Sequence, residues 1–332
     1  MRQPVLEVEG LTKHFPIRGG FFGGSAATVR AVDGVSFSVE RGRSLGLVGE
    51  SGCGKTTTAK LILKLEEPTS GVIRFEGREL NGLDAAGVRG YRRGVQAVFQ
   101  DPFASLNPRM RVDAIIAEPL VTHEKLPSAE VRKRVEKLLD VVGLARRSAT
   151  LFPHEFSGGQ RQRIAIARAL SLEPKLIVLD EPVSALDVSI RAQILNLLTD
   201  LQTQLGLSYL FIAHDLAAVA HMSQQVAVMY LGKIVELGDA AEISMDPKHP
   251  YTQALFAAAL PAHPDEARDE IVVAGEVPSP IAPPPGCHFH PRCPFAMPRC
   301  SSEPPKLLTV GGRTIACHLY DGGSSPDIPS VR

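Results

Sequence analysis

Short apolar runs alternate with amphipathic stretches along most of the chain, from Val5 to about Gly238. Six runs rich in Val, Ile and Leu predict strands, namely SLGLVGE, VIRFEG, VQAVFQ, KLIVLDE, LSYLFIAH and QVAVMYLGKIVELG. Strands that alternate with helices are typical of an α/β domain. We therefore expect a largely parallel sheet covered by helices.

Two stretches have the period of an amphipathic helix. In SAEVRKRVEKLLDVVGL, Ser128 is the expected N-cap and Gly143 the expected stop. Its buried face would contain Val131, Val135, Leu138, Leu139 and Val142. A second helix is predicted from near Ser189, with a buried stripe of Ile190, Ile194, Leu197, Leu198, Leu201 and Leu205. We interpret both apolar stripes as core.

Two other regions depart from this alternation. IRGGFFGGSAATVR, residues 17–30, is rich in glycine and predicts a mobile insertion between early strands. Beyond Gly238, DPKHPYTQALFAAALP predicts one short helix, and Pro278 to Pro305 is too rich in proline for regular structure. We expect a boundary near residue 240, with one domain at 1–240 and a smaller C-terminal extension at 241–332.

Composition narrows the classes of function. Among the 332 residues, Lys and Arg together number 36, and Asp and Glu together also number 36. The formal net charge is therefore zero, and no overall positive potential would attract nucleic acid. The sequence has no run of 18 apolar residues, and MRQPVLEVEG lacks the apolar core of a signal peptide. Five cysteines do not make a secreted disulfide scaffold. We expect a cytoplasmic protein whose link to any membrane goes through another protein.

A phosphate-binding pattern occurs in GESGCGKTT, between the expected strand Ser44–Val48 and the expected helix Thr56–Leu65. Glycines let successive N–H groups face phosphates, and the helix N-terminus adds partial positive charge. Lys55 would bridge the β- and γ-phosphates, and the Thr56 hydroxyl would hold Mg²⁺. The alternative is a glycine-rich turn that binds nothing. The whole loop is Gly49, Glu50, Ser51, Gly52, Cys53, Gly54, Lys55, Thr56 and Thr57, in which we interpret Cys53 as a small filler.

The run KLIVLDE ends in two acids. Asp180 would ligate Mg²⁺ or order water around it, and Glu181 could polarise the water that attacks the γ-phosphate. Alone, an apolar run that ends in acids is commonplace. Together with a phosphate loop it predicts a hydrolytic site.

The stretch FSGGQRQRIAIARAL resembles the signature motif of ATP-binding cassette (ABC) proteins, through Ser157, Gly158, Gly159 and Gln160. Further residues resemble the motifs expected beside it: Gln100 the Q-loop, Ser184, Ala185, Leu186 and Asp187 the D-loop, His214 the switch histidine, and Phe15 the aromatic residue that stacks on adenine. The resemblance covers residues 5 to about 240. It implies an ABC-type P-loop nucleotide-binding domain, with a RecA-like core, an antiparallel β subdomain and a helical subdomain.

The same resemblance implies the roles of these residues. The signature motif would contact ATP held by the opposite subunit, so that ATP joins two cassettes and hydrolysis releases them. His214 would sense the γ-phosphate and act with Glu181 in catalysis. Gln100 would join Thr56 and Asp180 around Mg²⁺ and report to the segment that touches a membrane partner. Phe156 replaces the leucine that many members have before the motif.

Two further stretches, VFQDPFASLNPRMRV and HPYTQALFAAALP, resemble ATP-binding subunits of dipeptide/oligopeptide ABC importers, and ASLNPR resembles the second of their two paralogous ATPases. This implies an ATPase that powers import of peptides or a related small solute from the cytoplasmic face of the membrane. Its partners would be a paralogous ATPase, two transmembrane permease subunits and an extracytoplasmic solute-binding protein, with no nucleic acid. The alternative is an ABC ATPase of DNA repair or translation, which the single cassette and balanced charge disfavour.

Four cysteines lie in the extension, at Cys287, Cys293, Cys300 and Cys317, with three histidines alongside. Four thiolates suit either a [4Fe-4S] cluster or Zn²⁺. The wide, unequal spacing favours the cluster, and the resemblance adds weight because some importer ATPases carry one in this extension. Zinc and unliganded or disulfide-linked cysteines are the alternatives. We expect a structural role and a small, irregular, cysteine-rich C-terminal extension.

Overall fold

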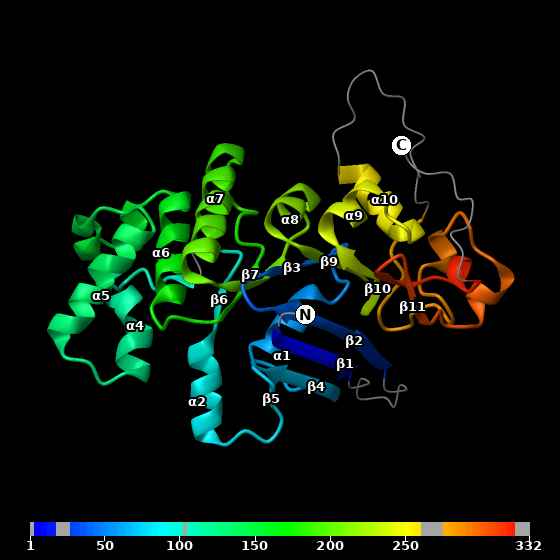
Figure 1. Ribbon diagram of the computed structural model, residues 1–332, viewed down its shortest axis with the longest axis horizontal. Helices are drawn as coiled ribbons and strands as arrows, with labels where there is room; N and C mark the ends of the chain where they lie inside the picture. Colours follow the sequence, from blue (N-terminus) through cyan, green and yellow to red (C-terminus); the bar gives the residue numbers. More distant parts are fainter. Residues whose placement is uncertain (1–2, 18–26, 102–104, 260–274, 323–332) are drawn as a thin grey trace, which may run out of the picture. The chain divides into compact units, whose positions relative to one another are not determined.

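The computed structural model describes residues 3–17, 27–101, 105–259 and 275–322 (Figure 1). The chain forms two compact units. Unit 1 comprises Met1–Leu6, Val39–Ser44 and Arg74–Phe211, and unit 2 comprises Glu7–Ser38, Leu45–Ile73 and Ile212–Arg332. The extension after residue 240 thus belongs to the same unit as the phosphate loop, and the division into 1–240 and 241–332 stays a prediction.

Unit 1 is mainly helical. Its helices are α2 (Ala85–Gly94), α4 (Val112–His123), α5 (Ser128–Val141), α6 (Gly158–Leu170) and α7 (Val188–Leu205), with 3₁₀ turns at Arg146–Thr150 and Pro153–Glu155. Helices α4, α5 and α6 pack on one another, and α6 also packs on α7 and on strand β6 (Figure 1). Most of α6 is buried because it lies at the centre of these contacts.

The strands of unit 1 are short and apolar. They are β6 (Val95–Val98), β7 (Leu176–Asp180) and β8 (Ser208–Ile212), in the order β8-β7-β6. Strands β6 and β7 are parallel. The first four residues of β7 are at most 1% exposed, as expected for a strand covered on both faces. Strand β5 (Arg78–Glu79) pairs with the end of β4.

Unit 2 contains two sheets. One holds most of β1 (Pro4–Ile17), β2 (Ala27–Glu40) and β4 (Ser70–Phe75), in the order β2-β1-β4. The other holds β3 (Ser44–Val48), β9 (Gln225–Tyr230), β10 (Lys233–Asp239), β12 (Arg313–Ala316) and β11 (Leu307–Val310), in the order β3-β9-β10-β12-β11. Strand β3 is parallel to β9, and the remaining pairs are antiparallel.

The helices of unit 2 are α1 (Lys55–Ile62), α8 (Leu216–Met222), α9 (Ala240–Met245) and α10 (Pro250–Ala259). Helix α9 packs on β9, β10 and α8, and α8 also contacts α10. Three 3₁₀ turns follow within residues 275–322, at His290–Arg292, Pro298–Ser301 and His318–Tyr320.

The run QVAVMYLGKIVELG is a hairpin of two strands. Tyr230 pairs with Lys233 across the turn Leu231–Gly232, whose φ angles are 42° and 80°. Two consecutive positive φ angles give a turn whose twist matches that of the paired strands. The expected largely parallel sheet is therefore correct for β6–β7 and β3–β9 and wrong beyond β9, where the pairing is antiparallel.

Details of three predicted helices also differ. The N-cap of α5 is Pro127, without a side-chain cap bond, so the prediction of Ser128 as cap is wrong. Gly143 does end the helix, with a φ of 71° and its N–H bonded to Asp140 O. Leu205, predicted to be buried, is 53% exposed at the end of α7. Helix α1 ends at Ile62, three residues before the expected Leu65.

The C-terminal extension is partly regular. Residues 278–305 contain only 3₁₀ turns among the described elements, as the prolines predict, but β12 pairs with β10 and β11 pairs with β12. Ile315, Cys317 and Tyr320 form a small buried cluster there. The short helix predicted in this region is present as α10, and the prediction of an irregular extension is wrong at β11 and β12. The glycine-rich insertion lies mostly at residues 18–26, outside the described part of the chain.

Candidate nucleotide-binding site

The backbone of the phosphate loop packs closely on its neighbours in unit 2. Gly49 and Gly54 have φ angles of 150° and 111°. A Cβ atom on Gly49 would lie 2.2 Å from Met229 O, and one on Gly54 would lie 2.2 Å from Ala31 O. Side chains rarely adopt this backbone conformation, and the space for one is already filled. Glycine is therefore required at both positions.

Lys55 begins α1 and folds back over the loop. Its Nζ donates hydrogen bonds to Gly49 O at 2.7 Å and Glu50 O at 3.0 Å, and the residue is only 7% exposed. The ammonium group thus lies against the loop, where phosphate oxygens can compete for it. Thr56 follows it and is exposed, so that a cation could reach this position. These residues fit a nucleotide phosphate and its Mg²⁺ ion.

Cys53 is a packed residue of the loop. It is 3% exposed, its carbonyl accepts a hydrogen bond from Gly232 N at 2.9 Å, and burial raises the pKa of its thiol. A buried neutral thiol is a poor nucleophile. These contacts support its interpretation as a small filler.

The C-terminal extension also holds the loop. Glu50 N–H donates to Tyr251 Oη at 2.8 Å. The Glu50 carboxylate pairs with the Arg292 guanidinium through two bonds of 2.8 and 3.1 Å. Sequence reasoning missed both contacts. The available signal was an acid within an anion-binding loop, which calls for a positive partner elsewhere in the chain.

In unit 1, the two predicted acids follow one another at the end of β7. Asp180 is its last residue and is half-buried. Glu181 has a φ of 49°, and its carbonyl accepts hydrogen bonds from Ser184 N at 3.3 Å and Ser184 Oγ at 3.1 Å. Non-glycine residues in this conformation are strained and cluster at functional sites. Ser184, from the predicted D-loop, helps to hold this conformation.

The signature residues form the start of α6. Ser157 is the N-cap: its Oγ accepts from Gln160 N at 3.4 Å, and Gln160 Oε1 accepts from Ser157 N at 3.0 Å. This reciprocal pair is a capping box, which fixes the helix N-terminus. A Cβ atom on Gly159 would lie 2.4 Å from Ile190 Cγ2, and one on Gly158 would lie 3.3 Å from Leu186 Cδ2. The structure thus brings the signature and D-loop residues together in unit 1.

The other predicted residues lie at the ends of strands. Gln100 is exposed two residues after β6, and His214 is exposed two residues after β8. Asp215, next to His214, caps α8 by accepting from Ala217 N at 3.0 Å. Phe15 is half-buried near the end of β1, and Lys13 Nζ lies 4.8 Å from the centre of its ring.

The four cysteines of the extension do not form a metal site as they are placed. Within the described ranges, no group of three or more His, Cys, Asp or Glu side chains could hold a metal ion. Burial raises the pKa of Cys287, that of Cys293 to about 11 and that of Cys317 to about 12. The predicted iron–sulfur cluster and its zinc alternative therefore find no support in the structure.

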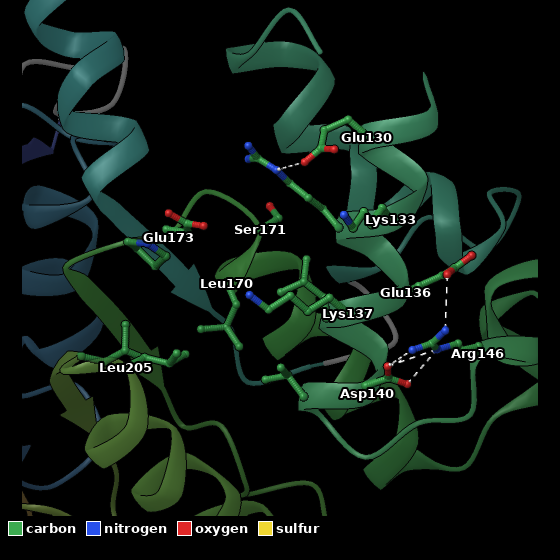
Figure 2. A pocket seen from close by; sticks show the side chains of 15 residues that line it. Glu130, Lys133, Glu136, Lys137, Asp140, Arg146, Leu170, Ser171, Glu173 and Leu205 are labelled. Carbon is green, nitrogen blue, oxygen red and sulfur yellow. Dashed lines mark hydrogen bonds and ion pairs between the residues drawn. The ribbon is translucent and has the colours of Figure 1, made fainter. Parts of the chain in front are cut away.

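A surface cavity of about 950 Å³ lies between α5 and the ends of α6 and α7 (Figure 2). Charged side chains of both signs line it, including Arg146, which pairs with Asp140 at 2.7 Å. Leu205 and Leu170 contribute apolar surface. None of the predicted site residues lines this cavity.

Comparison with known proteins agrees with the fold. Residues 32–184 match the ABC transporter family, and residues 235–300 match the family described as "Oligopeptide/dipeptide transporter, C-terminal region". The fold is similar to the ATP-binding cassette MJ0796 bound to ADP and phosphate, with a TM-score of 0.62 and 27% identity over 71% of this chain and 98% of that one. The fold is that of an ABC-type P-loop ATPase.

Two relatives show to which family of ABC ATPases the chain belongs. The oligopeptide transport ATP-binding protein AppF of Bacillus subtilis is 50% identical over 96% of this chain and 98% of its own length. The dipeptide transport ATP-binding protein DppF of Escherichia coli is 47% identical, with coverage of 98% and 97%. The chain belongs to the family of dipeptide and oligopeptide ABC transporter ATP-binding proteins. No helix in the described ranges has the length and apolar character needed to cross a bilayer.

Proposed function

We propose that the chain is the ATP-hydrolysing subunit of an ABC importer for di- or oligopeptides or a related small solute. The observation that carries the proposal is the identity of 47–50% to peptide-transport ATPases over nearly the full length of both chains. The phosphate loop supports it, because its glycines and Lys55 fit nucleotide phosphates.

The proposed roles of the residues follow the motifs. Lys55 and the loop N–H groups bind the phosphates. Mg²⁺, when bound, neutralises developing charge on the phosphates, and Thr56, Gln100 and Asp180 are the residues proposed to hold it. Glu181 orients and polarises the attacking water, and its constrained backbone supports this role.

The remaining motifs are proposed to act between subunits and on the base. His214 senses the γ-phosphate, and Phe15 stacks on adenine. The N-terminus of α6 contacts ATP of the opposite cassette, which its fixed cap supports because the partial positive charge at a helix N-terminus attracts anions. The D-loop residues pack beside this motif and would move with it.

The proposed assembly has three kinds of partner. A paralogous ATPase completes the pair of cassettes, two transmembrane permeases form the pathway, and an extracytoplasmic solute-binding protein delivers the solute. The ATPase would lie on the cytoplasmic face of the membrane. The iron–sulfur cluster of the cysteine-bearing extension stays a separate prediction that rests on cysteine spacing. Iron, sulfide and zinc assays on anaerobically purified protein test it: stoichiometric zinc without iron, or no metal, would reject the cluster.

The test of the hydrolytic role is Glu181→Gln in the assembled complex. We expect steady ATP turnover at this chain's site to fall by about 10²- to 10³-fold, because the water loses its polarising group, while ATP still binds. Lys55→Ala is the comparison variant, in which binding also weakens. Unimpaired turnover in Glu181→Gln, at the site built on Lys55, would reject the assignment of Glu181.

A further inference from the structure

The phosphate loop carries a negative charge of its own. Glu50 is its second residue, directly after Gly49, and its side chain is 31% exposed. A carboxylate here opposes binding of a polyanion such as ATP, since like charges at close range repel. The loop would therefore bind nucleotide less well unless this charge were neutralised.

Arg292, from the cysteine-bearing segment of the extension, neutralises it. The guanidinium is 9% exposed and donates to both carboxylate oxygens of Glu50, at 2.8 and 3.1 Å. The bond to this carboxylate raises the pKa of the guanidinium, so the charge is permanent at physiological pH. Two parallel charge-assisted bonds fix the geometry more firmly than a single exposed ion pair.

An aromatic cluster holds Arg292 in place. The guanidinium carbon lies 5.9 Å from the ring centre of Tyr230 and 6.0 Å from that of Phe289. The rings of Tyr230, Tyr251 and Phe289 pack on one another at 4.7 to 5.4 Å, and each is at most 2% exposed. These residues come from β9, α10 and the extension. The cluster thus joins the sheet to the segment that carries Arg292.

The backbone around Arg292 is fixed at further points. Cys287 N–H donates to Cys300 O at 2.8 Å, which closes the cysteine-bearing segment on itself. The His288 ring contacts Leu231 O, at the turn between β9 and β10, through Nδ1 at 3.2 Å. In the same turn, Gly232 N–H donates a hydrogen bond to Cys53 O of the phosphate loop at 2.9 Å. The extension and the loop are therefore held against one common hairpin.

We propose that Arg292 is a positioning residue of the ATP site, which cancels the charge of Glu50 and so raises the affinity of the phosphate loop for nucleotide. This inference rests on the proposed ATP-binding function and adds a role for the C-terminal extension in it. The alternative is that the Arg292–Glu50 pair acts only as a mechanical clamp on the loop. In that case the hydrogen bonds between the two side chains would matter, and the balance of their charges would not. The two explanations differ in the result expected for removal of both charges.

The experiment measures the affinity of the purified full-length chain for methylanthraniloyl-ATP with Mg²⁺. Arg292→Gln is expected to weaken binding by about three- to tenfold, as one uncompensated unit charge acting through a partly solvated medium predicts. Arg292→Lys keeps the positive charge but cannot donate two parallel hydrogen bonds to the carboxylate, and its affinity for the analogue should remain within about twofold of wild type. Arg299→Gln is the matched control, since Arg299 lies in the same segment and pairs only with Glu303 and Asp321 among the described residues.

Removal of both charges separates the explanations. Glu50→Gln alone should bind the analogue as well as wild type or more tightly, and Glu50→Gln with Arg292→Gln should return to within about twofold of wild type, because no net charge is left. The defect of Arg292→Gln should also shrink between 0.1 M and 1 M salt, as the screening length falls from about 10 Å to about 3 Å. Thermal unfolding checks that each variant is folded.

The results that would overturn the inference are distinct from failure of the proposed function. If wild type does not bind the analogue, the proposed function fails. If wild type binds and Arg292→Gln binds equally well, or if the double variant stays as weak as Arg292→Gln, charge neutralisation is wrong. Should Arg292→Gln fail to fold, Glu50→Gln alone decides, because weaker binding by that variant would refute the inference.

Discussion

The Tyr251 hydroxyl offers a selective perturbation of the phosphate loop. Tyr251 is 1% exposed, and its Oη accepts the hydrogen bond from Glu50 N–H at 2.8 Å. Tyr251→Phe keeps the ring that packs on Tyr230 and Phe289 and removes only this acceptor. The Glu50 amide then loses its partner, which we expect to lower the free energy of unfolding by about 1–2 kcal/mol.

The loop should also become more variable in the absence of nucleotide. Nucleotide binding must then restore its order, and a cost of up to about 1 kcal/mol corresponds to a rise in the KM for ATP of up to about fivefold. The kcat should change little, since no group that contacts the reacting atoms is removed. The assays are ATP turnover by the assembled complex and urea unfolding of the purified chain.

Tyr209→Phe is the matched control. Tyr209 is fully buried in unit 1, and its hydroxyl donates to Leu198 O at 2.9 Å, so this variant also loses one buried hydrogen bond. We expect a similar loss of stability from both variants and a raised KM only in Tyr251→Phe. If both variants changed the KM equally, or if neither did, the role of Tyr251 in holding the loop would be refuted.

Three further predictions address the loop, the extension and catalysis. Gly54→Ala should reduce binding of an ATP analogue more than tenfold, because a Cβ atom would lie 2.2 Å from Ala31 O; near-normal binding by a folded variant would contradict this. Burial lowers the pKa of His249 from 6.5 to about 3, so between these values only the unfolded chain takes up this proton. The free energy of unfolding should therefore fall as the pH drops from 6.5 toward 3, by up to about 1.4 kcal/mol per pH unit. His249→Asn should reduce this dependence of the unfolding free energy on pH, and an unchanged dependence would contradict the assignment to His249. Glu181→Gln should bind ATP and fail to turn it over, as rapid-quench measurements on the complex can show; normal turnover there would argue against its role.

Sequence reasoning worked best where the signal was local. The strand Ser44–Val48 and its phosphate loop are dictated by one apolar run and one glycine-rich turn, and the structure has the strand at those residues. The signature motif was also readable, because Ser157 and Gln160 are spaced for a capping box. Its interpretation as an ATP contact nevertheless came from a family resemblance, since a capping box alone occurs at many helices.

Features that depend on contacts between residues far apart in the sequence could not be predicted from it. Strand β12 forms because it pairs with the exposed edge of β10, and nothing in RTIA specifies that partner. Glu50 and Arg292 are separated by 242 positions, so only the folded chain shows that they meet. Ser128 was misassigned as a cap because the turn after Pro127 places it inside the helix. The four cysteines looked like a ligand set by count and spacing, whereas the described residues contain no group of side chains placed to hold a metal ion.

The most direct test of the proposed function is ATP-driven uptake in proteoliposomes. They would contain this chain, its paralogous ATPase and both permeases, with the solute-binding protein and labelled di- to pentapeptides supplied on the face that receives solute. We predict that wild type accumulates peptide only with ATP and that Lys55→Ala abolishes accumulation in complexes that still assemble. Peptide uptake without ATP, or uptake that persists in complexes that carry Lys55→Ala, would contradict the account.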